Sequence, residues 1–301
     1  MKRRTFLMSG AALAVAAPTA TLAAAEAPAP GGPKSKVVAV RNGEPEALFR
    51  KGIAALGGIA AFVRPGQKVV VKPNIGWDRA PEYGANTNPA LVGEIVRQCL
   101  AAGAAQVEVF DHTCNNWERC YRNSGVAEAV ARAGGKMVEA HDRDAYREVS
   151  RPAAGSMKTA LIHRAILDAD VFINVPILKH HGGARVTAAL KNFMGLVWDR
   201  QYMHAHDLDQ CIADAALYRK PDLNVIDAYR IMPTNGPRGV TLNDVRTVKY
   251  QILSTDIVAA DVLACKLLRT PPETVRYLAH AAKLGLGTDD ESRLDIVRLE
   301  A

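Results

Sequence analysis

Short apolar runs alternate with amphipathic segments along most of the chain. The runs are rich in β-branched residues, and the segments between them carry apolar residues at helical spacing. The predicted strands are Lys36–Val40, Lys68–Lys72, Gln106–Phe110, Lys136–Glu139, Val171–Val175, Leu223–Ile226 and Val248–Leu253. The predicted helices are Ala90–Ala102, Gly125–Ala133, Thr187–Met194, Leu208–Leu217, Asp256–Leu268 and Glu273–Lys283. This alternation predicts an α/β fold of the Rossmann-like kind, with a doubly wound, mostly parallel sheet and helices on both faces.

The first 25 residues have the pattern of an export signal. Lys2-Arg3-Arg4 precedes a weakly apolar stretch from Ser9 to Leu22, and the small residues up to Ala25 suit a cleavage site. Adjacent arginines followed by Thr-Phe-Leu match the twin-arginine type, which exports folded proteins. The stretch is too rich in Ala, Gly, Pro and Thr for a stable membrane span. We therefore expect a twin-arginine signal peptide over 1–25, recognised by the export machinery, and a periplasmic or otherwise extracytoplasmic mature protein.

Composition bounds the remainder of the chain. Residues 26–36 are rich in Pro, Gly and Ala, which indicates a linker, and residues 37–301 are predicted to form a single α/β domain. The 301 residues are 49% hydrophobic and 23% charged, which excludes wholesale disorder. Loss of the signal lowers the formal charge from +7 to +4, with 35 basic and 31 acidic residues. With 6% aromatic residues and no later basic run, nucleic acid is not an expected partner.

Polar residues follow several of the predicted strands where those strands end. In open α/β sheets, ligands bind outside the carboxyl ends of the strands, so these residues are expected to meet in one crevice. Residues two apart in an extended chain share a side, so Lys179 and His181 point the same way and His180 points the opposite way. The residues expected at the crevice are Lys72, Asn74, Asp111, His112, Lys179, His181 and Asp227.

The crevice is predicted to be cationic and rich in hydrogen-bond donors. The substrate-binding candidates are Lys72, Asn74, Lys191, Asn192, Gly236 and Arg238, the last two in the turn NGPRG. Backbone N–H groups of such turns can face an oxyanion, so a small carboxylate or phosphate ligand is expected. The alternative is that the lysines form structural ion pairs with Asp111, Asp227 or Asp256.

Acid–base chemistry is the second expectation for the crevice. A lysine desolvated beside other cations has a lowered pKa and can act as a base. The catalytic candidates are Lys179 and His181, with Asp111 to orient the histidine. Isomerisation, elimination and hydrolysis all remain open.

A metal-assisted version of this chemistry is a further alternative. His112, His204 and His206, with Cys114 and Asp207 nearby in sequence, offer ligands for one transition metal ion, zinc or iron. No local metal motif is present, so these can equally be surface histidines. The sequence has no GxGxxG, P-loop, GxSxG or CxxCH motif, so neither NAD nor haem is expected.

One set of motifs resembles a known family. The chain carries KPN at 72–74, LKHHGGARVTAALKNFMG at 178–195, VIDAYRIMPTNGPRG at 225–239 and STDIVAADVLAC at 254–265. This combination resembles the domain of unknown function family 362 from about Val37 to Val297. Some members of that family have ferredoxin-type cysteine motifs, but Cys99, Cys114, Cys120, Cys211 and Cys265 lack that spacing, so no iron–sulfur cluster is expected. The resemblance implies the fold and the site location and leaves the reaction open.

Taken together, the sequence favours an exported enzyme that acts on a small anionic substrate in a crevice at the strand ends. Lys72, Asn74, Lys191 and Asn192 would bind the substrate, and Lys179 with His181 would provide the acid–base chemistry. The alternative is a non-catalytic factor that binds a metal or ligand for another exported protein.

Overall fold

The computed structural model describes residues 34–301, so the predicted signal peptide and most of the predicted linker lie outside the described residues. The first strand, β1, already begins at Ser35. The strands are β1 (Ser35–Arg41), β2 (Lys68–Pro73), β3 (Gln106–Val109), β4 (Lys136–Met137), β5 (Tyr146–Ser150), β6 (Thr159–His163), β7 (Val171–Val175), β8 (Ile177–His181), β9 (Arg185–Thr187), β10 (Leu223–Met232), β11 (Arg246–Ser254) and β12 (Leu294–Glu300).

The helices lie between the strands along the chain. They are α1 (Pro45–Ala54), α2 (Pro89–Ala101), α3 (Trp117–Asn123), α4 (Val126–Arg132), α5 (Arg164–Leu167), α6 (Arg200–Ala205), α7 (Leu208–Ala215), α8 (Ile257–Leu267) and α9 (Arg276–Lys283), with a 3₁₀ turn η4 (Lys191–Leu196). None of the helices within residues 34–301 has the length and apolar character needed to cross a membrane. Asn88 is the N-cap of α2, because its side chain accepts the Ala90 N–H at 3.0 Å.

One large sheet organises the molecule. Its strand order is β12-β1-β11-β10-β7-β2-β3-β4, and every strand in this order runs in the same direction except β11. The β8–β9 hairpin extends from β10, and β5 with β6 forms a separate antiparallel pair. The predicted α/β fold with a mostly parallel sheet is therefore confirmed, with one antiparallel strand between β10 and β1.

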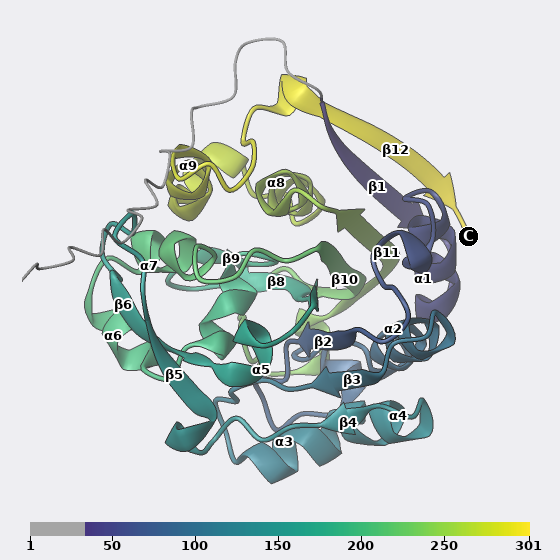
Figure 1. Cartoon of the computed structure of the whole chain (residues 1–301). Helices are drawn as coiled ribbons and strands as arrows, with labels where there is room; N and C mark the ends of the chain where they lie inside the picture. Colours follow the sequence, from purple (N-terminus) through teal and green to yellow (C-terminus); the bar gives the residue numbers. More distant parts are fainter. Residues whose placement is uncertain (1–33) are drawn as a thin grey trace, which may run out of the picture.

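Both faces of the sheet are buried, because consecutive residues of a strand point to opposite faces. Val69 and Val71 of β2 pack with α1, α2 and α4, whereas Val70 packs with the core beneath α7, α8 and α9. Figure 1 shows these two sets of helices on opposite sides of the sheet. Two apolar cores on one sheet explain why its strands read as continuous apolar runs rather than as alternating ones.

The order of the strands reverses between β2 and β7. From β2 the chain moves outward to β3 and β4, and then returns to place β7 on the other side of β2. In this pairing Lys72 of β2 lies opposite Asn174 of β7. A crevice opens at such a reversal, outside the carboxyl ends of the two strands. The fold thus puts the residues that follow β2, β3 and β7 around one point.

Two details of the predicted elements were wrong. The helix expected over Thr187–Met194 is absent, because Thr187 ends β9 and the buried carboxylate of Asp261 accepts the N–H groups of Ala189 and Leu190, at 2.6 and 3.0 Å. The chain then enters η4. These tertiary hydrogen bonds outweigh the local helix propensity of the segment.

The second error concerns the end of β10. The predicted strand Leu223–Ile226 continues to Met232, so Asp227 lies within the strand and does not follow it. Its carboxylate accepts the N–H groups of Asn88 and Tyr229, at 2.7 and 3.0 Å. The polar stretch 141–156 contains β5, which is held by pairing with β6.

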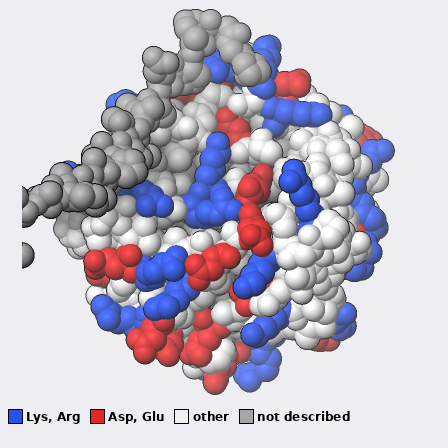
Figure 2. Space-filling model, in the orientation of Figure 1, with Lys and Arg blue, Asp and Glu red and all other residues white. Residues whose placement is uncertain are grey.

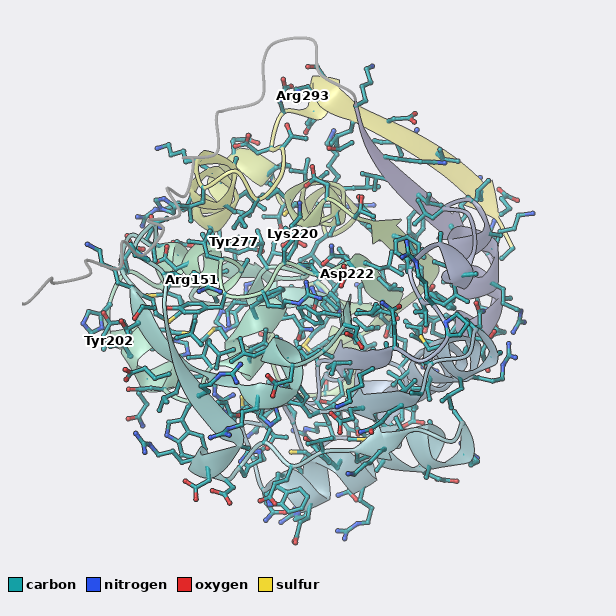
Figure 3. The ribbon with its side chains drawn as sticks, in the orientation of Figure 1. Arg151, Tyr202, Lys220, Asp222, Tyr277 and Arg293 are labelled. Atoms are coloured by element: carbon teal, nitrogen blue, oxygen red, sulfur yellow. The ribbon has the colours of Figure 1, made fainter. Side chains whose placement is uncertain are left out.

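A helix from the end of the chain supports the β8–β9 hairpin. The side chain of Tyr277 in α9 is fully buried, and its hydroxyl donates to the Val186 carbonyl of β9 at 3.2 Å. Figure 3 shows Tyr277 directed from α9 into the interior of the molecule. α9 therefore packs against the β8–β9 hairpin, whose strand β8 carries Lys179 and His181.

Candidate functional site

A cavity of about 430 Å³ lies at the strand reversal. Its walls come from the loops after β2 and β3, from the β8–β9 hairpin, and from η4 and α6. We call it the site cavity. Its polar and charged lining includes Asn74, Asp111, Lys179, Thr187, Lys191 and Arg200.

The floor of the site cavity rests on a buried ion pair. The Lys72 ammonium lies 2.7 Å from Oδ1 of Asp111, and both side chains are almost fully buried. The other carboxylate oxygen of Asp111 accepts the Ile75 N–H at 2.6 Å. Burial lowers the pKa of Lys72, and the Asp111 carboxylate opposes that shift. This pair joins the end of β2 to the end of β3, and it realises the structural ion pair that the sequence left open.

Gly195 is required by the position of this ion pair. A Cβ atom on Gly195 would collide with Oδ1 of Asp111 and would stand 2.7 Å from Nζ of Lys72. The Gly195 carbonyl also accepts the His112 N–H at 3.3 Å. Because only glycine lets η4 approach so closely, the glycine of the motif K-N-x-x-G has a steric role at the site.

A row of buried amides extends from the ion pair through the sheet. Nζ of Lys72 donates to Oδ1 of Asn192 at 3.0 Å, and Asn192 donates to Oδ1 of Asn174 at 2.8 Å. Asn174 donates to Oδ1 of Asn224 at 3.0 Å, and Asn224 donates to the Ser254 carbonyl at 3.2 Å. We call Asn192, Asn174 and Asn224 the amide row. It links η4 to β7, β10 and β11 through uncharged, satisfied groups.

Lys179 is buried in the wall of the site cavity, and none of the carboxylates within residues 34–301 forms an ion pair with it. Its ammonium nitrogen donates to Oδ1 of Asn74 at 2.9 Å and to the carbonyl of Ala85. The pKa of Lys179 is lowered to about 7, mainly by burial; Cys114 and Asp111 oppose this shift, and the charges of Lys191 and Lys72 contribute to it. A lysine of this kind exchanges its proton near neutral pH.

Lys191 and Arg200 complete the cationic lining. Nζ of Lys191 contacts Sδ of Met194 at 2.8 Å, and burial lowers its pKa to about 8. The Arg200 guanidinium donates to the carbonyls of His112 and Thr113, at 2.9 and 2.7 Å, and to the Cys114 thiol at 3.3 Å. None of the carboxylates in the described chain pairs with Lys191 or Arg200.

Thr187 adds a hydroxyl group to the same wall. It pairs with Lys179 across the β8–β9 hairpin, and its side chain is buried. Its Oγ1 has no hydrogen-bond partner within residues 34–301. Because a buried hydroxyl without a partner is costly, this atom is suited to a hydrogen bond with a ligand in the cavity.

The tautomer of His181 is fixed by its backbone contacts. Its Nδ1 accepts the N–H groups of Gly183 and Ala184, at 3.1 and 3.0 Å, so the ring proton must be on Nε2. Burial lowers the pKa of His181 to about 3, and Lys191 and Lys179 add to that shift. His181 therefore lines the cavity as a neutral hydrogen-bond donor.

His112 has the opposite tautomer. Its Nδ1 faces the Val197 carbonyl at 3.1 Å and must donate, which leaves the lone pair on Nε2. The ring stacks on Trp198 with centroids 5.4 Å apart. Burial lowers its pKa to about 4, with the Arg200 charge adding to the effect. His112 is a neutral acceptor at neutral pH.

Comparison with known proteins identifies the family. Residues 69–266 match the sequence profile described as Domain of unknown function (DUF362), which is well over half of the chain. The chain belongs to the DUF362 family. The matched region contains every residue that the sequence placed at the site, from Lys72 to Arg238.

Other proteins resemble this DUF362 chain at lower similarity. A Synechocystis protein described as thylakoid-associated is 26% identical over 254 residues, which cover 80% of this chain and 75% of that protein. A Thermotoga maritima crystal structure aligns with a TM-score of 0.49 and 14% identity over 75% of this chain. The lactate racemase apoprotein from Thermoanaerobacterium thermosaccharolyticum aligns with a TM-score of 0.48 and 12% identity over 76% of this chain. The alignments span 60% and 56% of those two structures.

The DUF362 fold brings most of the predicted site residues together. Those at the site cavity or directly beneath it are Lys72, Asn74, Asp111, His112, Lys179, His181, Lys191, Asn192 and His204. Gly236 packs against the backbone of His180, and Arg238 lines a neighbouring hollow. His206 does not line the cavity, because its ring stacks on Tyr202 with centroids 3.8 Å apart. Figure 3 shows Tyr202 at the outer edge of the molecule.

The three histidines proposed as metal ligands are not gathered into one set. His112 and His204 line the site cavity, whereas His206 does not. Within residues 34–301 there is no group of three His, Cys, Asp or Glu side chains placed to hold a metal ion. The five cysteines are all free thiols, and Cys114 is exposed while Cys120 is buried.

Sequence reasoning did not assign Arg200, Thr187 or Asn174 to the site. Thr187 stands in the V-T-x-x-L-K-N motif and Asn174 is the one polar residue of an otherwise apolar strand, so both had a visible pattern. Arg200 follows a stretch with no motif, and only the folded chain brings it to the loop after β3.

We predict that Lys72→Met lowers the free energy of unfolding by about 3–5 kcal/mol, because it leaves the Asp111 carboxylate buried without its cation. The double variant Lys72→Met, Asp111→Asn should recover most of this loss, because the buried charge is gone. Urea unfolding of the single and double variants measures both effects.

Lys68→Met is the matched control, since Lys68 lies in the same strand with an exposed side chain. It should change stability by no more than about 0.5 kcal/mol. If Lys72→Met were no more destabilising than Lys68→Met, the ion pair would not support the site.

Proposed function

We propose that this DUF362 protein is an enzyme that binds a small anionic substrate, a carboxylate or phosphate, in the site cavity. The observation that carries the proposal is uncompensated positive charge: Lys179, Lys191 and Arg200 all line the cavity. Asp111 is the one carboxylate among the described lining residues, and it is already bound to Lys72. An anion with acceptor oxygens would satisfy the three cations together.

The charge of the cavity differs from that of the outer surface. On the face seen in Figure 2, Lys and Arg side chains are interspersed with Asp and Glu. Concentrated charge of one sign in a buried hollow, on a protein with mixed surface charge, favours a specific anionic ligand.

The proposed chemistry is proton transfer by Lys179. With a pKa of about 7, its amine is partly neutral at neutral pH. Asn74 and Ala85 accept hydrogen bonds from two of its N–H groups, which leaves one position on Nζ for a proton taken from the substrate.

Lys191, with a pKa of about 8, keeps its charge at neutral pH and binds the acid group of the substrate. The Nε2–H of His181 can donate to a substrate oxygen. Isomerisation and elimination both begin with such a transfer.

We predict that sulfate and acetate bind to the apo protein and that their affinity falls as the pH rises. The bound anion requires protonated lysines, and the pKa values of Lys179 and Lys191 in the free cavity are about 7 and about 8. Binding above these values must take up protons, so affinity should fall by up to about tenfold per pH unit for each lysine. Calorimetry from about pH 6 to about pH 9 in several buffers measures affinity and proton uptake, over a range where both anions keep their charge.

Lys191→Met should weaken sulfate and acetate at least about tenfold, because it removes a buried cation. Lys51→Met removes an exposed lysine of α1 and is the matched control, with affinity unchanged. Affinity independent of pH, or equal in both variants, would contradict an anion site built on these lysines.

An isotope-exchange experiment distinguishes an enzyme from a protein that only binds its ligand. We predict that the wild type, incubated in heavy water with short carboxylates that bind, incorporates deuterium at an acidic C–H position. Lys179→Met should slow this exchange by about 10²–10⁴-fold, the usual contribution of a general base. Mass spectrometry of the carboxylate measures the exchange, with Lys51→Met as control. Tight binding of anions without any exchange would favour a non-catalytic ligand carrier.

We also propose that the protein is exported in folded form through its twin-arginine signal. The supporting feature is the sequence Arg3-Arg4-Thr5-Phe6-Leu7 ahead of the weakly apolar stretch. Arg3→Lys with Arg4→Lys keeps the charge and should leave the full-length precursor in the cytoplasm. Cell fractionation with immunoblotting measures this, and export of the double variant at the wild-type level would exclude the twin-arginine route.

A further inference from the structure

A second hollow adjoins the site cavity. It measures about 350 Å³ and is lined by Asp78, Arg79, Asn115, Asn116, Arg119 and Arg238. We call it the arginine notch. Its lining, as far as residues 34–301 form it, holds three arginines and one carboxylate.

The same three loops wall both hollows. Trp77, Cys114 and Pro237 line the site cavity, and the residue that follows each of them lines the arginine notch. Because consecutive Cα atoms are about 3.8 Å apart, the two hollows meet along these loops. At this boundary the Asp78 N–H donates to Oδ1 of Asn115 at 3.2 Å, which ties two of the loops together.

The carboxylate of the notch is fully engaged. Asp78 forms an ion pair with Arg119 and accepts the Asn123 amide at 2.6 Å on its other oxygen. Arg79 and Arg238 therefore supply positive charge that Asp78 does not neutralise. Within residues 34–301, Arg79 and Arg238 have no carboxylate partner. The Arg79 guanidinium carbon lies 4.8 Å from the ring centroid of Tyr83, within the range of a cation–π contact.

The two hollows offer different kinds of cation. The site cavity has two lysines whose protons exchange near neutral pH, whereas the notch has arginines that stay charged. Arginine binds carboxylate and phosphate groups through two parallel hydrogen bonds, which fixes orientation. A notch of this type suits an acid group that takes no part in the reaction. The energy of binding that group can position the reacting part of the ligand in the site cavity.

We propose that the arginine notch is a second subsite for the ligand of the site cavity, which makes that ligand an elongated dianion with a carboxylate or phosphate group at each end. The proposal rests on the proposed anion-binding function of the site cavity. One acid group is bound by Lys191, close to the base Lys179, and the other lies with Arg79 and Arg238. The chain between them passes over Trp77 and Cys114.

The test compares linear dicarboxylates with monocarboxylates of the same carbon number, from four to eight carbons, by calorimetry at about 0.15 M salt. We expect one dicarboxylate length to bind at least about tenfold more tightly than its matched monocarboxylate, because only the dianion reaches the notch. Arg79→Gln with Arg238→Gln should remove this advantage and leave the monocarboxylate affinity unchanged. Arg143→Gln with Arg298→Gln removes two exposed arginines elsewhere and should keep the advantage.

The outcomes separate the two proposals. If the wild type binds neither series, the anion-binding function of the site cavity is wrong. If it binds monocarboxylates but no dicarboxylate more tightly, or if the advantage survives in the Arg79→Gln, Arg238→Gln variant, the second subsite is wrong and the function of the site cavity stands.

Discussion

The ammonium group of Lys72 and the carboxylate of Asp111 are buried against each other at the ends of two neighbouring strands. Burying one of these charges alone would be prohibitive, so each residue requires the other, and both require β2 and β3 to end in register. Asn192 and Gly195 of η4 then pack directly onto the pair. The floor of the cavity is thereby assembled from three segments distant in sequence.

Above that floor the protein buries more positive charge than it neutralises. Lys179 and Lys191 are held by neutral groups, a carbonyl, an amide and a thioether, which leaves their charges available. His181 and His112 stay neutral and present a donor and an acceptor respectively, because backbone contacts set their tautomers. This arrangement of buried lysines and neutral histidines is what supports the proposed binding of an anion in the site cavity.

The sequence was sufficient for the α/β fold class and for most of the central strands, because strand periodicity is a local pattern. Polar residues at strand ends are local patterns too, and the fold brings several of those predicted, Lys72, Asn74 and Asp111 among them, to one cavity. The sequence does not show that Lys72 forms a structural ion pair whereas Lys179 pairs with none of the described carboxylates. That difference depends on which loop each side chain contacts in the folded chain. The helix predicted over Thr187–Met194 is wrong for the same reason, because the backbone there is held by a hydrogen bond to Asp261, which lies in a helix distant in sequence. Arg200 and the pairing of Thr187 with Lys179 also arise only from tertiary contacts.

The amide row gives the site cavity a property that its charged residues lack. Asn192, Asn174 and Asn224 neither gain nor lose protons in the physiological range, so the hydrogen bonds from η4 to β11 do not respond to acidity. The protonation of Lys179 and Lys191, by contrast, changes with pH near neutrality. A change of pH would thus alter the charge along the cavity wall, whereas the amide hydrogen bonds beneath it would stay the same.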